Sequence, residues 1–159
     1  MDSLIKSRLA AISNKDSIRL YFNLLKILID DLDLHPENAK LALTVPKSRN
    51  DFVVNLNSRW VLNLYRDGSI AFMIRKENFK GLQKIVKAEK YFRYSSCTKP
   101  DDYFATYTYD QLTNEGSLQA IVAYWLQACR AFEPVMRRSP YRKFHNEEFY
   151  EMAVGGVKF

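Results

Sequence analysis

The chain has 159 residues, of which 47% are hydrophobic and 14% aromatic, with only 5 Gly and 5 Pro. This composition excludes a disordered or fibrous chain and predicts a single domain over 1–159, with 155–159 as a tail or the start of a linker to a further domain. Its 24 Lys and Arg exceed its 18 Asp and Glu, and the net charge of +6 favours a polyanionic partner such as nucleic acid.

The N-terminal part of the sequence predicts helices. Ser13-Asn14-Lys15-Asp16 is typical of a capping box, in which a hydroxyl N-cap precedes a carboxylate by three residues. Apolar residues then recur at helical spacing from Ile18 to Leu32, which predicts a helix over about 14–33. A shorter helix is expected over about 4–12, and residues 35–38 are typical of a loop.

Short strand-like segments follow this loop. Residues 41–45, 52–57 and 60–65 are apolar or half-alternating, as expected for strands. Asp67-Gly68 predicts a tight type I′ hairpin turn, because both central residues of such a turn need a positive φ. The partner strand is expected over 70–74, so these segments predict an antiparallel meander.

The most basic segment, Lys76 to Lys90, separates two kinds of side chain when it is drawn as a helix. One face carries Lys76, Lys80, Lys84, Lys87 and Lys90, and the opposite face carries Phe79, Leu82, Ile85 and Val86. Between Arg59 and Lys99 the sequence has ten Lys and Arg against three Asp and Glu, a net charge of +7. We expect a docked helix whose lysines face a polyanion. The alternative is a solvated lysine face that contacts nothing.

Residues 103–109 alternate in a way that predicts a strand with two different faces, one of them rich in tyrosine. This tyrosine face would offer nucleic-acid bases a stacking platform or a pocket for a flipped base. The alternative, which we favour, is that it packs on the helix expected over about 117–133. The candidate base-stacking residues are Trp60, Tyr103, Tyr107 and Tyr109.

The C-terminal part predicts a short helix that Asn146 caps and that Gly155-Gly156 ends. Taken together, the elements predict the α+β class, with helices packed on one face of an antiparallel sheet.

Catalytic signatures are missing from the sequence. It contains no Gly-rich phosphate loop, no G-x-S-x-G elbow and no H-E-x-x-H motif. Its two histidines, His35 and His145, lie far apart, and Cys129 falls on an apolar helix stripe. We therefore expect no enzyme activity, no cofactor and no metal site. The polar N-terminus and the lack of a long apolar run predict a cytoplasmic protein without a membrane span.

A second basic cluster lies in a loop with interleaved aromatics, residues 137–145. Ser139 to Tyr150, with the sequence SPYRKFHNEEFY, resembles the N-terminal regions of bacterial McrB-type AAA+ ATPases of modification-dependent restriction systems, and Phe52 to Arg75 is similar in character. The resemblance implies a module that recognises DNA at a modified base and acts beside an AAA+ ATPase or nuclease subunit. It assigns no role to an individual residue.

These observations predict a non-catalytic module that binds duplex DNA in a bacterial restriction or defence system. The alternative is a protein-interaction module that docks an acidic partner or self-associates. The predicted phosphate contacts are Lys76, Lys80, Lys84, Lys87, Arg93, Arg137, Arg138, Arg142 and Lys143.

Overall fold

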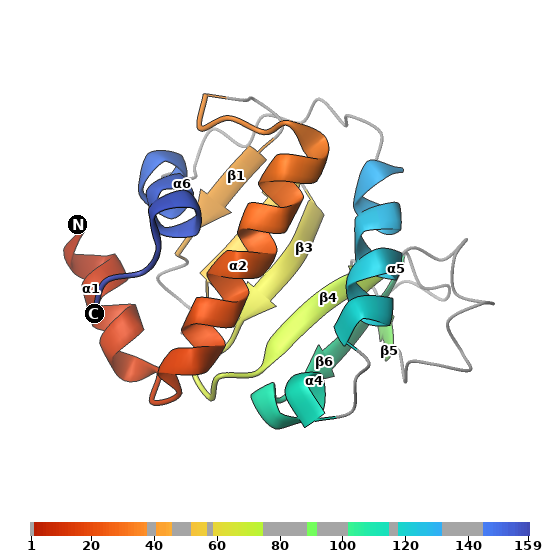
Figure 1. Ribbon diagram of the computed structural model, residues 1–159, viewed down its shortest axis with the longest axis horizontal. Coiled ribbons are helices and arrows are strands. Elements are labelled where there is room, and N and C mark those ends of the chain that lie inside the picture. Colours follow the sequence, from red (N-terminus) through yellow and green to blue (C-terminus); the bar gives the residue numbers. More distant parts are fainter. Residues whose placement is uncertain are drawn as a thin grey trace.

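A computed structural model describes residues 2–37, 41–45, 52–56, 59–74, 89–91, 102–114, 118–131 and 145–159. A six-stranded sheet has the order β1-β2-β3-β4-β6-β5, and α2, α5 and α6 lie on the same face of it (Figure 1). The strands are β1 (Leu41–Thr44), β2 (Phe52–Leu56), β3 (Arg59–Leu64), β4 (Ile70–Ile74), β5 (Glu89–Tyr91) and β6 (Asp102–Tyr107). The helices are α1 (Ser3–Ala11), α2 (Lys15–Leu32), α4 (Tyr109–Asn114), α5 (Leu118–Arg130) and α6 (Asn146–Gly155). This arrangement confirms the predicted α+β class.

The sheet is antiparallel throughout, and β1 to β4 form the predicted meander. The order then changes, because β6 pairs with β4, placing Ile74 opposite Tyr103, and β5 adds to the outer edge of β6. Lys90 lies in β5, opposite Tyr103, so the prediction that the lysine-rich helix extends to Lys90 is wrong. Residues 75–88, which hold the rest of that predicted helix, lie outside the described residues.

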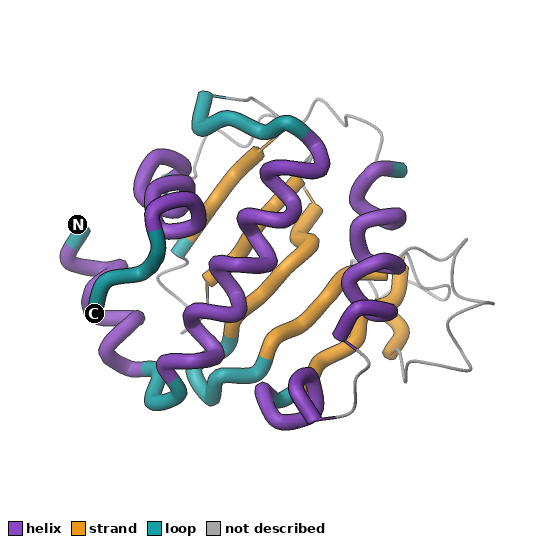
Figure 2. Tube along the Cα trace, in the orientation of Figure 1, coloured by secondary structure: helices purple, strands orange, loops and turns teal. Residues whose placement is uncertain are grey.

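The helices α2 and α6 lie on the same face of the sheet (Figure 2), and an aromatic cluster joins them to β2. The ring centroids of Phe22 and Phe52 are 6.1 Å apart, and Phe149 lies 5.6 Å from each of them. All three side chains are almost completely buried. Ring pairs at these separations contribute about 0.5–1.5 kcal/mol each beyond the burial of apolar area. This cluster holds the two ends of the chain against the same half of the sheet.

A second cluster joins α5 to the middle of the sheet. Val54 pairs with Leu62 while Asn55 pairs with Trp60, so Val61 is the extra residue of a β-bulge in β3. The indole Nε1–H of Trp125 donates a 2.8 Å hydrogen bond to the Val61 carbonyl, and its ring packs edge-on against Phe72 at 5.7 Å. Trp125 thus satisfies a carbonyl at the bulge and fixes α5 on β4.

The ends of α2 are well defined, but its cap differs from the prediction by one residue. The Asn14 side chain, and not that of Ser13, accepts hydrogen bonds from the backbone N–H groups of Asp16 and Ser17 at 3.0 and 3.1 Å. At the other end, Asp33 adopts a left-handed conformation with φ 51° and donates its N–H to the Ile29 carbonyl. The helix itself is confirmed over nearly its full predicted range.

The hairpin between β3 and β4 lies where the sequence predicted it, but its turn type is different. Of the turn residues only Gly68 has a positive φ, 86°, which excludes type I′. The Gly68 N–H donates to the Tyr65 carbonyl, and the Tyr65 N–H donates to the Ser69 carbonyl. This pattern is that of a three-residue loop in which glycine forms the bulge. A Cβ at position 68 would also lie 3.2 Å from Ser17 Oγ, so α2 packs closely on this turn.

The strand β6 ends earlier than predicted because a helix begins. Thr108 and Gln111 form a reciprocal capping box: the Thr108 N–H donates to Gln111 Oε1 at 2.9 Å, and the Gln111 N–H donates to Thr108 Oγ1 at 3.2 Å. Tyr109 is consequently the first residue of α4, a helix that we did not predict. The prediction that Tyr109 continues the strand is wrong.

Candidate functional site

The predicted phosphate-contacting residues all lie outside the described residues, so the structure gives their flanking positions only. The segments 75–88 and 92–101 are bordered by Ile74, Tyr91 and Asp102. Strand pairing brings these three residues together at the same end of the neighbouring strands β4, β6 and β5. His145, which follows segment 132–144, lies at the opposite edge, where its N–H donates to the Leu43 carbonyl of β1 at 2.8 Å. The predicted phosphate contacts that lie outside the described residues are Lys76, Lys80, Lys84, Lys87, Arg93, Arg137, Arg138, Arg142 and Lys143.

The four candidate stacking aromatics do not share a surface. Tyr103 is 9% exposed, and the half-buried Tyr107 packs on Phe72 in the layer beneath α5. Trp60 lies on the other face of the sheet, where its ring is 6.0 Å from that of Phe104. Tyr109 is in α4. A continuous platform of Tyr103, Tyr107 and Tyr109 is therefore not formed, as expected from the alternative in which the tyrosine face packs on the helix.

Charge is distributed unevenly between the described segments and the remainder of the chain. The described residues contain ten Lys and Arg and thirteen Asp and Glu, a net charge of −3. The whole chain has 24 Lys and Arg and 18 Asp and Glu. The remaining segments therefore contain fourteen Lys and Arg and five Asp and Glu, a net charge of +9. The excess positive charge of the protein thus lies entirely in the segments between the described elements.

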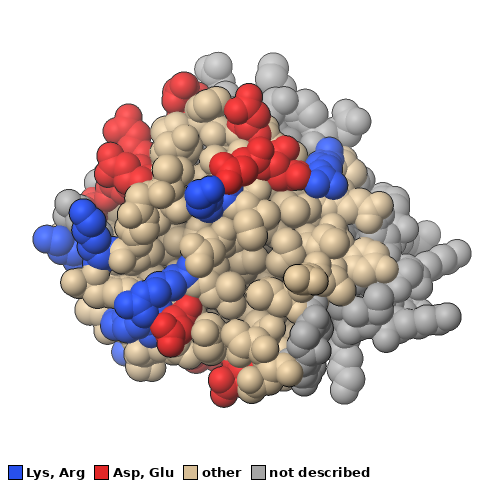
Figure 3. Space-filling model, in the orientation of Figure 1, with Lys and Arg blue, Asp and Glu red and all other residues tan. Residues whose placement is uncertain are grey.

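On the helix-bearing face, basic side chains lie close to acidic ones (Figure 3). Lys26 Nζ is 2.6 Å from Asp30 Oδ2, and Arg19 Nη1 is 2.8 Å from Asp16 Oδ1. Arg130 holds Asp31 through two hydrogen bonds that link α5 to α2, and this contact lowers the pKa of the Asp31 carboxyl. Because these three cations are paired with acids, the described part of this face is a poor candidate for binding a polyanion.

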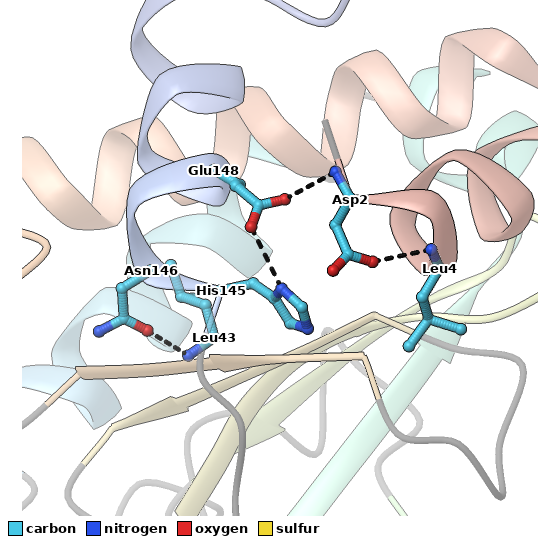
Figure 4. A network of polar contacts seen from close by, with 6 residues as sticks. All are labelled: Asp2, Leu4, Leu43, His145, Asn146 and Glu148. Atoms are coloured by element: carbon cyan, nitrogen blue, oxygen red, sulfur yellow. Dashed lines mark hydrogen bonds and ion pairs between the residues drawn. The ribbon is translucent and has the colours of Figure 1, made fainter.

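A compact group of polar side chains lies where the N-terminus meets the start of α6 (Figure 4). His145 is only 4% exposed, and its Nδ1 is 3.4 Å from Glu148 Oε1. Glu148 Oε2 accepts a 3.3 Å hydrogen bond from the Asp2 N–H, and Asp2 Oδ1 caps α1 by accepting from the Leu4 N–H at 2.7 Å. One histidine and two carboxylates therefore converge from the two ends of the chain.

Asn146 anchors this group to the sheet and does not cap α6, which corrects the sequence interpretation. Its Oδ1 accepts from the Leu43 N–H, and its Nδ2 donates to the Pro36 carbonyl, both at 2.9 Å. The N-cap position belongs to His145, whose side chain makes no capping hydrogen bond. The sequence predicts a basic loop over residues 137–145, and the burial of His145 was not predicted. Its spacing to Glu148, three residues along a helix start, was the available signal.

Cys129 is buried in α5, and burial raises the pKa of its thiol well above the ordinary value, as expected for a core residue and not for a nucleophile. Among the described helices none is both long and apolar enough to cross a membrane. Comparison of the chain with protein-family models, with curated proteins and with solved structures found no match.

Proposed function

We propose that this protein is a non-catalytic module that binds duplex DNA through its basic connecting segments. The observation that supports the proposal best is the charge distribution: the described elements carry a net charge of −3, and the segments that join them carry +9. Lys and Arg grouped in such segments suit a phosphate backbone, because each contact releases a condensed counterion.

Three segments hold most of this charge. Residues 75–88, 92–101 and 132–144 together contain eleven Lys and Arg and three Asp and Glu. In the proposal, the first two segments contact phosphates through Lys76, Lys80, Lys84, Lys87 and Arg93. The third segment contacts them through Arg137, Arg138, Arg142 and Lys143.

The resemblance to McrB-type modules extends the proposal to the reading of a modified base in a bacterial restriction system, in the cytoplasm and beside an AAA+ ATPase or nuclease subunit. Of the four candidate aromatics, Trp60 and Tyr109 fit this role best, since both are half-buried and neither belongs to the layer beneath α5. A base stacked on an exposed ring contributes about 1–3 kcal/mol.

A binding screen tests the proposal. The full chain is titrated with duplex, single-stranded and base-modified duplex DNA of one sequence at two salt concentrations. We expect duplex binding that weakens steeply as salt rises, and tighter binding to one modified duplex. Trp60→Ala or Tyr109→Ala should reduce the preference for modified over plain duplex more than it reduces affinity for plain duplex.

The second candidate function is docking to an acidic protein or to another copy of the chain. The same clustered cations favour it, because an acidic protein surface would also complement them. Absence of duplex binding at low salt, together with salt-sensitive self-association or capture of an acidic partner, would support this function and contradict DNA binding.

A further inference from the structure

We propose that Asp2, His145 and Glu148 form a zinc-binding site that links the N-terminal helix to the C-terminal helix. One ligand atom from each side chain lies within 4.8 Å of the other two. His145 directly follows the proposed DNA-binding segment 132–144. The test of the zinc site measures zinc binding and thermal stability, so its outcome does not depend on DNA binding.

The geometry of the histidine and glutamate already matches that of neighbouring zinc ligands. A distance of 3.4 Å between His145 Nδ1 and Glu148 Oε1 is long for a hydrogen bond. Zinc bonds of about 2.0–2.1 Å in a tetrahedral site place two ligand atoms about 3.4 Å apart. The Asp2 ligand atom lies within 4.8 Å of the other two, so zinc binding requires this carboxylate to move closer to them.

The histidine is held rigidly, as a metal ligand should be. Its backbone N–H donates to the Leu43 carbonyl, and its own carbonyl accepts from the Phe149 N–H at 3.0 Å. Its side chain is 3% exposed. Asp2 and Glu148 are half-buried, whereas His145 is buried, so water could reach a fourth position on the side of the carboxylates. Three protein ligands and one water make a common zinc coordination.

The donor set also suits a cation. Two carboxylates and one imidazole contribute the ligand atoms, and among the described Lys and Arg residues none pairs with Glu148. Neutral imidazole with two carboxylates suits zinc better than magnesium, which prefers an all-oxygen shell. The competing explanation is that Asp2 and Glu148 simply stabilise the N-termini of α1 and α6 as first-turn or capping acids.

Equilibrium dialysis of the untagged, chelator-treated full chain against zinc chloride distinguishes the two explanations. We expect one equivalent of zinc per chain. A free zinc concentration ten times the dissociation constant should raise the melting temperature by about 3–6 °C, because only the folded state brings the three ligands together. No binding, or no change in melting temperature on binding, would overturn the proposal.

Matched variants locate the site. Glu148→Gln keeps an acceptor for the Asp2 N–H, and Asp2→Asn keeps the cap of α1, so both should fold yet bind zinc at least tenfold more weakly. His145→Asn should abolish binding. The controls are Glu147→Gln, an exposed acid in the same turn, and His35→Asn, which removes the exposed histidine 3.3 Å from Asp33. Unchanged zinc affinity in Glu148→Gln and Asp2→Asn would contradict the assignment even if His145→Asn failed to fold.

Discussion

Trp125 shows how much a single side chain contributes to this fold. It is fully buried, and its indole N–H satisfies the carbonyl that the β3 bulge presents to α5. We expect Trp125→Phe to lower the free energy of unfolding by about 2–4 kcal/mol, since it leaves that carbonyl unpaired and removes packed volume. Urea unfolding followed by circular dichroism measures the loss. Trp60→Phe, at a half-buried ring, is the control and should cost less than about 1 kcal/mol.

Cys129 provides a second test at the scale of one residue. Its burial in α5 raises the pKa of the thiol, so almost none of it is thiolate at pH 8. In a Cys97→Ser background, iodoacetamide should leave the native protein unmodified at pH 8 and label Cys129 only in urea. Mass spectrometry of the native and unfolded samples checks this. Rapid labelling of the native protein would show that α5 does not pack as described.

At the scale of elements, α2 offers a matched pair of adjacent residues. The Asn14 side chain accepts from two N–H groups at the start of the helix, and Ser13 lies just before it. Asn14→Ala should destabilise the protein by about 1 kcal/mol, whereas Ser13→Ala should change its stability by less than about 0.5 kcal/mol. The shift of the urea midpoint distinguishes them. The reverse order would restore Ser13 as the cap.

The elements that the sequence predicted are those with strong local signals. The apolar stripe of α2 and the Asp67-Gly68 turn each lie within a short window, and the helix and hairpin were placed correctly. The capping box of Thr108 and Gln111 was equally local, and it was overlooked because the alternation of residues 103–109 favoured a strand. Strand β5 has only three residues, too few to show an alternating pattern, and among the described strands it pairs with β6.

The candidate sites were less predictable because they depend on contacts between distant residues. Asp2 and Glu148 are 146 positions apart, and no pattern in the sequence relates them. The burial of Tyr103 follows from the pairing of β6 with β4 and from the position of α5 over that pair. By contrast, the clustering of basic residues can be counted from the sequence. The structure adds that the described elements carry a net negative charge and do not contribute to the excess of Lys and Arg.

At the scale of the whole molecule, the protein has a weakly acidic scaffold and basic connections between its elements. The central claim is that these connections bind DNA phosphates. A variant in which Lys80, Lys84 and Lys87 are replaced by Gln tests it. Its matched control replaces Lys6, Lys26 and Lys158, all within the described elements or the C-terminal tail, so that both variants lose the same charge.

The decisive measurement is the slope of log Kobs against log[salt] for duplex DNA, determined for the wild type and both variants. Each lost phosphate contact should flatten the slope by about 0.9, so the Lys80/Lys84/Lys87 variant should show a slope shallower by up to about 2.7 on every sequence tested. The control should keep a slope close to that of the wild type. Equal slopes and equal affinities in the two variants would contradict the claim and leave the lysines as solubilising residues.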